Sequence, residues 1–336
     1  MEITGNQIKE AWSRKTVGLG SLGRLEELAT RLSFIQQSLE ISTHPERILI
    51  FAGTHGISQE GVSSLPPGSM AQEVLHLLRG GSAISVLCKN QNIDLQVIDT
   101  GVDSHWPEGF IPRPDFIWKP IRRGTRNFLK EPAMLAEELE TALELGREQV
   151  RRAAREGIKV IGLGELGVGG TTASSAICCA LLQLNPVSVV GRGAGLSDET
   201  LNRKIHIVHR ALTLHQSNIH SPIDWLRCVG GFEIAAMTGA ILEAKHHHMP
   251  MVIDGIVSTA SAVAAFAHDP TCRDFCFFSH LAPDRGHHLI LQMLGVEPLL
   301  DLKLAVGEGI GVALAIPLLA AAANLQREIT PIDPVS

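Results

Sequence analysis

Tyrosine is absent from this chain of 336 residues, and aromatic residues make up only 4% of it. Large aromatic side chains therefore cannot fill most of a core, and Ala, Leu, Ile and Val must do so. Hydrophobic residues reach 45% and charged residues 19%, a balance that allows a sizeable core and excludes a disordered chain. The length suits one large domain accompanied by a smaller one.

The sequence also lacks basic runs, a signal peptide and a disulfide framework. Its net charge is −6 with both signs interspersed, so no nucleic-acid partner is expected. The first residues, MEITGNQIKEAWSRK, contain no apolar stretch of the kind that directs secretion. The six cysteines, which form no Cys-x-x-Cys pair, are Cys88, Cys178, Cys179, Cys228, Cys272 and Cys276. We therefore expect reduced thiols in a cytoplasmic protein.

Long hydrophobic runs are scarce, and the most apolar one covers residues 309–325. It is rich in small residues, contains Pro317 and directly follows Glu308. Its length is marginal for a membrane span, so a buried helix is the favoured interpretation and no membrane partner is expected. The chain contains neither an internal repeat nor a low-complexity segment.

Short apolar runs that end in small or polar residues recur along the chain. Runs that are apolar throughout, rather than alternating, are typical of strands covered on both faces. The predicted strands are ILIFAG (48–53), LQVIDTG (95–101), KVIGLG (159–164), VSVVGRG (187–193), MVIDG (251–255) and FCFFS (275–279). Helical patterns lie between them, for example at 134–156 and 232–245. This alternation predicts an α/β fold with a mostly parallel sheet and helices on both faces.

Both ends of the chain have helical patterns. We expect residues 1–45 and 297–336 to pack together as a small helical domain beside a large α/β domain of residues 46–296. In parallel sheets, ligands bind at the carboxyl ends of the strands. Those ends carry glycine together with polar side chains, as in THG (54–56), DTG (99–101), GELG (164–167), GRG (191–193), DG (254–255) and SH (279–280). Their convergence predicts the active site.

The segment Gly-Leu-Gly-Glu-Leu-Gly at 162–167 matches the glycine pattern of dinucleotide-binding proteins. Glu165 would set a carboxylate beside a pyrophosphate, and no acidic residue ends the next predicted strand to hold a ribose. Both observations count against NAD. The segment continues with Gly169, Gly170, Thr171 and Thr172, whose amides and hydroxyls before a helix suit a single phosphate. A plain turn between a strand and a helix is the structural alternative.

Three further residues are candidates for chemistry. Glu308 lies between two glycines before the apolar run, where desolvation would raise its basicity and suit it to proton abstraction; a solvated capping residue is the alternative. Asp254 ends a predicted strand and could bind sugar hydroxyls or cap the next helix. Lys204 lies in a helix-like stretch, where an exposed face is the usual explanation unless the side chain points at a phosphate.

Histidines do not indicate a metal site. His246, His247 and His248 are adjacent, so they do not share one face of a helix or strand, and Pro250 follows. We expect this segment to be a surface loop. His206 and His209 have a spacing that suits a metal on a helix, but no further ligands lie nearby in the sequence.

Taken together, the motifs resemble the nicotinate-nucleotide:dimethylbenzimidazole phosphoribosyltransferase family, which makes the lower-ligand nucleotide of cobalamin. The matching segments are collinear over nearly the whole chain: GSLGRLEELA (20–29), HGISQEGVS (55–63), LRGGSAISVL (78–87), VIDTGVD (97–103), GLGELGVGGTTASSA (162–176), VGRGAGL (190–196), VGGFEIAAMTGAILEA (229–244), VIDGIVSTASA (252–262) and LAVGEGIGVALAIPL (304–318). The resemblance implies a Rossmann-like large domain, a homodimer, and small-molecule substrates without metal or cofactor.

The resemblance also implies roles for individual residues. Glu308 corresponds to the family's general base, and Glu165 to an acidic residue of the nucleotide pocket. Lys204 corresponds to a lysine near the phosphate, and Asp254 to the acid of the family's VDGF-like segment. The phosphate loop corresponds to Gly167, Gly169, Gly170, Thr171 and Thr172, and further substrate contacts are expected at Ser279, Leu65 and Glu73. The implied reaction transfers ribose phosphate from nicotinate mononucleotide to 5,6-dimethylbenzimidazole.

The chain departs from the family pattern at several positions. Thr54 replaces the usual Asp before His-Gly, and Gly170 replaces the usual Asn before Thr-Thr. Leu65 and Glu73 stand where polar contacts to the base are expected. These departures leave open a non-catalytic paralogue that binds a nucleotide or a base. The glycine pattern at 162–167 alone supports a third possibility, a nicotinamide-dependent oxidoreductase.

Overall fold

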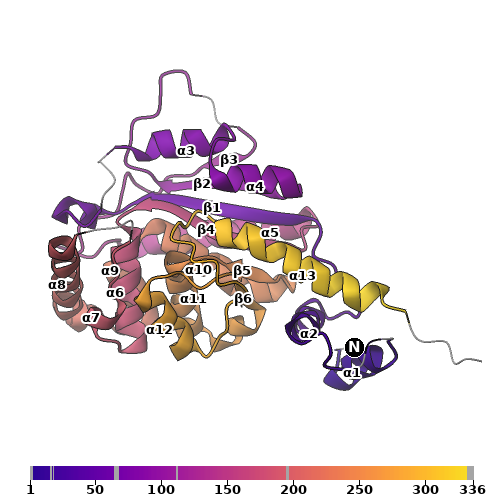
Figure 1. The fold of residues 1–336 in the computed structure, drawn as a ribbon. Coiled ribbons are helices and arrows are strands. Elements are labelled where there is room, and N and C mark those ends of the chain that lie inside the picture. The colour runs from indigo at the N-terminus through magenta and orange to yellow at the C-terminus, as the bar shows by residue number, and fades with distance from the viewer. Residues whose placement is uncertain are drawn as a thin grey trace, which may run out of the picture.

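The central feature of the fold is a six-stranded, entirely parallel sheet in the order β3-β2-β1-β4-β5-β6 (Figure 1). The computed structural model describes residues 3–15, 17, 19–63, 68–110, 113–193 and 197–330. The strands are β1 Glu46–Thr54, β2 Asp94–Gly101, β3 Phe116–Trp118, β4 Val160–Val168, β5 Met251–Ile253 and β6 Cys276–Phe278. This Rossmann-like order places the point at which the strand order reverses between β1 and β4. The predicted α/β fold is confirmed.

Helices cover both faces of the sheet, as a mostly parallel sheet requires. The cluster of buried residues on one face includes residues of β1 and β4 together with α1 Gly5–Ser13, α2 Arg24–Gln36, α3 Met70–Leu78, α4 Ala83–Gln91 and α13 Ile310–Glu328. The opposite face packs against α5 Ala136–Arg155, α6 Gly170–Leu182, α7 Pro186–Val189, α8 Asp198–His215, α9 Pro222–Val229, α10 Phe232–Ala244, α11 Ile256–His268 and α12 Arg285–Leu294. Short 3₁₀ turns are η1 Gly56–Glu60, η2 Gln216–Asn218, η3 Lys245–His247 and η4 Pro270–Phe275.

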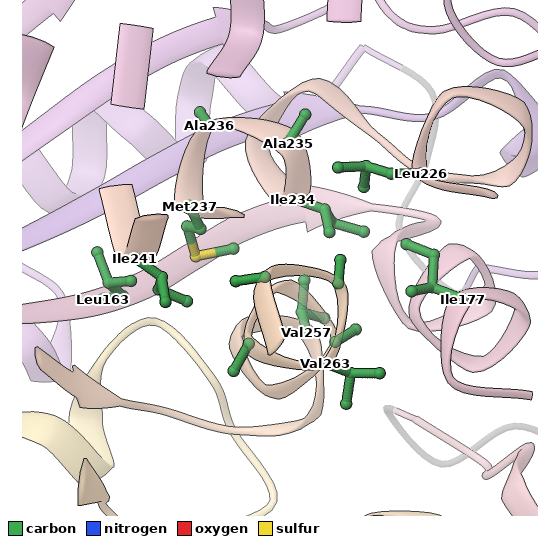
Figure 2. Packing of buried hydrophobic residues seen from close by; sticks show 14 of the residues in the cluster. Leu163, Ile177, Leu226, Ile234, Ala235, Ala236, Met237, Ile241, Val257 and Val263 are labelled. Atoms are coloured by element: carbon green, nitrogen blue, oxygen red, sulfur yellow. The ribbon is translucent and has the colours of Figure 1, made fainter. Parts of the chain in front are cut away.

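The larger core is built from aliphatic side chains, as the shortage of aromatic residues predicts. Figure 2 shows Leu163 of β4, Ile241 of α10 and Val257 of α11 converging in one layer. Ile177 of α6 and Leu226 of α9 extend this layer at one side. Fully burying one Leu or Ile side chain contributes about 1.5–3 kcal/mol, so a broad layer of small contacts can replace a few large rings.

Helices α5 and α10 approach closely enough that each needs a glycine. A Cβ added at Gly146 would lie 1.7 Å from the Ala236 carbonyl oxygen, and one added at Gly239 would lie 2.0 Å from the Leu143 carbonyl oxygen. We therefore expect Gly146→Ala to lower the free energy of unfolding by at least about 2 kcal/mol, because the two backbones must separate. Urea denaturation followed by circular dichroism measures the change.

A matched control for this glycine substitution is Gly5→Ala in α1, where the added Cβ would lie 3.7 Å from Phe34 Cζ, an ordinary contact. We expect Gly5→Ala to change the free energy of unfolding by less than about 1 kcal/mol. Equal effects of the two substitutions would contradict the proposed close packing of α5 on α10.

The structure differs from the sequence-based prediction at three local elements. Residues 187–193 do not form a strand, because Pro186 and the Asn185 side chain, which accepts from Val187 N at 2.9 Å, start the short helix α7 instead. The edge strand β3 was not predicted, since three residues are too few to show a pattern. The glycine pattern at 162–167 lies inside β4 and opens no helix.

The glycines of β4 make room for neighbouring elements rather than for a pyrophosphate. A Cβ at Gly162 would lie 2.2 Å from Val312 Cγ1, and one at Gly164 would lie 2.7 Å from Gly309 N. Because β4 has no side chain at these positions, the start of α13 can lie directly on the strand. This explains the pattern without a dinucleotide and removes the physical basis of the oxidoreductase alternative.

The two ends of the chain meet beside the sheet (Figure 1). Lys15 Nζ donates to Ile329 O at 3.1 Å, and Gln326 Nε2 donates to Ser33 Oγ at 2.7 Å. Helices α1, α2 and α13 share one buried cluster with the sheet residues Ile48 and Ile50. The division into a small domain (1–45 and 297–336) and a large one (46–296) stays a prediction.

Helix α13 is long and apolar enough to cross a membrane by length and composition alone. Its side chains Val312, Ile316 and Leu319 are buried against the rest of the chain, which is the arrangement of a core helix.

The six cysteines are buried and unpaired, as expected for reduced thiols. The segment of three histidines is the turn η3 and the residue after it, where His247 contacts Glu243 and His248 contacts Ile35 O.

Candidate active site

Two cavities lie at the carboxyl ends of the central strands, on opposite faces of the sheet. The larger one has a volume of about 490 Å³ and the smaller one about 240 Å³. Consecutive residues of β4 line different cavities, Glu165 the larger and Leu166 the smaller, because side chains alternate along a strand. In the same way, Gly307 lines the larger cavity and Glu308 lines the smaller one. The end of β4 and the loop before α13 therefore separate the two spaces.

Lys204 marks the anion-binding part of the larger cavity. Its side chain is only 1% exposed, which excludes the alternative of an exposed helix face. Its Nζ atom donates to Thr171 Oγ1 at 2.8 Å and to Gly191 O at 3.3 Å. Burial lowers the pKa of Lys204 to about 8, and nearby Asp284 opposes this shift. A buried ammonium beside a hydroxyl, with no carboxylate in hydrogen-bond contact among the described residues, suits a phosphate.

The predicted phosphate loop is only partly at the cavity surface. Thr171 lines the larger cavity, in the first turn of α6, whose N-cap Gly169 supplies no side-chain hydrogen bond. The amides of such a helix start favour an anion. Gly167, Gly169, Gly170 and Thr172 are not among the described lining residues. A Cβ at Gly169 would lie 3.0 Å from His55 Cβ, and Thr172 is fully buried. These two residues therefore pack beneath the cavity surface and do not form part of it.

Acidic groups gather where the two cavities meet. Glu165 lines the larger cavity, and its Oε2 atom is buried without a hydrogen-bond partner among the described residues. Burial, followed by the negative charges of Glu233, Asp254 and Glu308, raises the pKa of Glu165 well above its usual range. Asp254 is 2% exposed, and burial raises its pKa while His280 and the Gly309 amide oppose the shift. Perturbed carboxyl groups of this kind cluster at functional sites.

The loop that carries Glu308 is held in a defined shape. Glu308 has a backbone φ of 62°, which a residue with a side chain rarely adopts. Asp254 Oδ2 accepts a hydrogen bond from Gly309 N at 2.9 Å and so ties the loop to the end of β5. Burial, followed by the charges of Glu73 and Asp254, raises the pKa of Glu308. A half-buried carboxylate with raised basicity suits a general base.

Glu308 faces the smaller cavity together with residues of α3 and α4. Glu73 and His76 lie one helical turn apart on α3, and Ser82 caps α4. Leu77 and Leu166 add apolar wall. The sequence indicated Glu73 as a contact to the base, and the structure places it beside Glu308, although His76 was not predicted.

The remaining predicted residues have different outcomes. Ser279 is fully buried and does not line either cavity in the described part of the chain. Its neighbour His280 lines the larger cavity, although no role was predicted for this residue. Leu65 lies outside the described residues. Thr54, which departs from the family pattern, has a structural contact: its hydroxyl accepts a hydrogen bond from Asp103 N at 3.1 Å.

A second buried pair, which the sequence did not indicate, lies behind the glycine loop. His55 Nε2 lies 2.5 Å from Glu233 Oε1, and both side chains are 1% exposed or less. A Cβ at Gly170 would lie 3.6 Å from His55 Nε2 and 3.7 Å from Glu165 Oε2. The pair therefore supports the loop at its underside. Among the described residues no group of three or more His, Cys, Asp or Glu is arranged to hold a metal ion.

Comparison with known proteins agrees with this geometry. A family model described as phosphoribosyltransferase (DBI_PRT) matches residues 2–334. The nicotinate-nucleotide–dimethylbenzimidazole phosphoribosyltransferase of Geotalea uraniireducens is 40% identical over 320 residues, covering 95% of this chain and 90% of the relative. That of Ralstonia nicotianae is 41% identical over 324 residues, covering 96% and 90%.

A solved structure is similar over almost the whole chain. CobT from Thermus thermophilus superposes with a TM-score of 0.89 at 39% sequence identity, covering 96% of this chain and 95% of that one. Agreement of the family model, the full-length relatives and the fold supports the catalytic interpretation over a non-catalytic paralogue. The chain belongs to the DBI_PRT family of phosphoribosyltransferases.

Proposed function

We propose that this enzyme transfers the phosphoribosyl group of nicotinate mononucleotide to 5,6-dimethylbenzimidazole or a related base. The products are α-ribazole 5′-phosphate and nicotinate. The observation that carries the proposal is the position of Glu308, a carboxylate of raised basicity in the loop that separates an anion-binding cavity from a second cavity. One cavity then holds the nucleotide and the other the base, with the reacting carbon at their junction.

The reaction needs one proton removed and two partners aligned. The unprotonated ring nitrogen of the base attacks C1′ of the ribose and forms the new C–N bond. The bond from C1′ to the pyridinium breaks, and its electron pair returns to the nitrogen of nicotinate. Glu308 takes the proton from the other ring nitrogen of the base. Because the base and the leaving group occupy opposite sides of C1′, the β-nucleotide gives an α product.

The phosphate of the nucleotide provides the contacts that align the two substrates. Lys204 and the first turn of α6 at Thr171 bind the phosphate, which fixes the ribose relative to the loop of Glu308. The carboxyl groups of Glu165 and Asp254 line the same cavity, where they are positioned to contact the ribose. No cofactor or metal takes part in this scheme.

The direct test is incubation of the purified chain with nicotinate mononucleotide and 5,6-dimethylbenzimidazole, followed by chromatography. We expect release of nicotinate and formation of a nucleotide with the mass of α-ribazole 5′-phosphate, and neither without the base. Binding of both compounds without release of nicotinate would refute the proposal and favour the non-catalytic alternative.

Glu73 is expected to set the pH range of the reaction. Its negative charge raises the pKa of Glu308, so Glu73→Gln should lower that pKa. Because a general base must be ionised, kcat/KM falls as the pH falls through the pKa of Glu308. We therefore expect Glu73→Gln to shift the acid limb of the pH profile of kcat/KM to lower pH. Steady-state assays across the acidic and neutral range measure this limb.

A matched control for this pH shift is Glu10→Gln, which removes an exposed carboxylate from α1. It should leave the acid limb unchanged. An unchanged limb in Glu73→Gln as well would show that Glu73 and Glu308 do not interact in solution.

The setting of the enzyme follows from the family resemblance. We propose a homodimer acting in the cytoplasm on small-molecule substrates, without a nucleic-acid or membrane partner. Light scattering coupled to gel filtration measures the mass of the assembly, for which twice the chain mass of 36.2 kDa is expected.

A further inference from the structure

His280 is a buried histidine in the larger cavity that the scheme above does not use. Its side chain is only 1% exposed, yet it lines the cavity next to Asp254. The backbone holds it firmly, because His280 pairs with Leu300 as an isolated parallel bridge and Leu281 N donates to Leu300 O at 2.8 Å. The ring therefore has a fixed position at the end of β6.

One ring nitrogen of His280 is occupied by the protein. Its Nδ1 atom lies 3.0 Å from Ser279 Oγ and 3.6 Å from Asp254 Oδ1. The Ser279 hydroxyl is the hydrogen-bond partner of Nδ1, while Asp254 lies beyond hydrogen-bond distance and acts on the ring through its charge. A Cβ at Gly311 would lie 2.0 Å from the same nitrogen, so the first turn of α13 closes that side of the ring.

The other ring nitrogen is available to a ligand. Nε2 has no hydrogen-bond partner within the described residues, and it is not among their buried polar atoms that lack one. Nε2 accepts a hydrogen bond when it is unprotonated and donates one when it is protonated. A group in the cavity that can both donate and accept, such as a hydroxyl, is therefore the expected partner.

The position of His280 in the cavity indicates which part of the nucleotide forms this hydrogen bond. Lys204 and Thr171 form the anion-binding part of the same cavity, so the phosphate does not need His280. Asp254, which contacts His280 on one oxygen, holds Gly309 beside Glu308 with the other. His280 thus lies next to the loop of the general base. The ribose links the phosphate to the reacting carbon, and its hydroxyls can both donate and accept hydrogen bonds.

We infer that His280 is a substrate-binding residue whose Nε2 atom forms a hydrogen bond with a ribose 2′- or 3′-hydroxyl, with Asp254 and Ser279 orienting the ring from behind. The inference rests on the proposed function, and it explains why the chain buries Ser279 while presenting His280 to the cavity. It also makes the enzyme selective for ribonucleotides over deoxyribonucleotides.

The test combines substitutions at His280 with nicotinate mononucleotide and its 2′-deoxy and 3′-deoxy analogues. We expect His280→Ala to lower kcat/KM for nicotinate mononucleotide about tenfold, the value of one hydrogen bond. One deoxy analogue should lose a similar factor with the wild-type enzyme. His280→Ala should add little to the loss with that analogue, because the contact is already absent.

Two amide substitutions separate binding by Nε2 from a structural role of Nδ1. Gln can place a hydrogen-bonding amide group near the position of Nε2, so His280→Gln should keep more activity than His280→Asn, whose shorter amide reaches only the Nδ1 position. The reverse order would assign His280 to orienting Asp254. Equal losses of His280→Ala with the ribose and both deoxy substrates would also overturn the inference.

His287 provides the control for a buried imidazole. Its Nε2 atom contacts Thr259 Oγ1 at 3.0 Å, its Nδ1 accepts from Ala282 N at 3.1 Å, and burial lowers its pKa to about 3. His287→Gln should lower the melting temperature without discriminating between the ribose and deoxy substrates. If the wild-type chain releases no nicotinate, the proposed function fails, and calorimetric titration of the three nucleotides into wild type and His280→Ala still decides the ribose contact.

Discussion

Glu308→Gln is expected to lower kcat by about 10²- to 10⁴-fold, the usual contribution of a positioned general base. The amide matches the carboxylate in size but cannot take a proton from the attacking base. Because binding of the nucleotide depends on Lys204 and Thr171 in the other cavity, KM for nicotinate mononucleotide should change little. Steady-state kinetics with nicotinate release as the readout measure both constants.

The fold should tolerate this substitution. Glu308 is half-buried and lines a cavity, and among the described residues its loop is held by the bond from Gly309 N to Asp254 rather than by the Glu308 carboxylate. The melting temperature of Glu308→Gln is therefore expected to match the wild type, with Glu10→Gln again as a surface control. Near wild-type turnover in a folded Glu308→Gln enzyme would refute the assignment of Glu308 as the base.

Lys204→Met should raise KM for nicotinate mononucleotide by roughly 10²-fold, since a charge-assisted bond to a phosphate from a buried ammonium contributes about 1.5–3 kcal/mol. Removing this buried charge should not destabilise the protein. The folded state lowers the pKa of Lys204 to about 8, so the charged form is disfavoured in the fold. Thermal denaturation of Lys204→Met should give a melting temperature equal to or above that of the wild type.

The same residue predicts the alkaline side of the pH profile. As the pH rises through about 8, Lys204 loses its proton in the free enzyme, so kcat/KM should fall there. A bound phosphate opposes this loss, and kcat should therefore be less sensitive than kcat/KM. The alkaline limb should disappear in Lys204→Met. Arg203→Met is the matched control, because Arg203 is the preceding residue of α8 and pairs with Glu199 at the surface. Similar KM values for both variants would contradict a phosphate site at Lys204.

Some of the site was predictable because its signals are local. Asp254 at the end of an apolar strand follows a rule about strand ends, and Glu308 stands between two glycines before an apolar run. Neither signal needs tertiary information. The resemblance to a phosphoribosyltransferase family added the roles of Glu165 and Lys204, which single motifs left open. Comparison with relatives then established the family.

Other parts of the site were not predictable from the sequence. His280 and Ser279 are adjacent at one strand end, and the sequence could not decide which side chain would face the cavity. The pair of His55 and Glu233 is separated by 178 positions, so only folding brings it together behind the glycine loop. The burial of Lys204 was also hidden, since its helix carries exposed charges on neighbouring positions.

The sequence by itself determined the class of fold and the use of small aliphatic residues in the core, because periodicity and apolar content act over a few neighbouring residues. It did not determine the structural role of the glycines in β4. Only the tertiary structure decided that Gly162 and Gly164 make room for Val312 and Gly309 instead of a pyrophosphate. The physical reason is that close approach of two backbones depends on segments about 150 positions apart, and such contacts leave no periodic pattern in either segment.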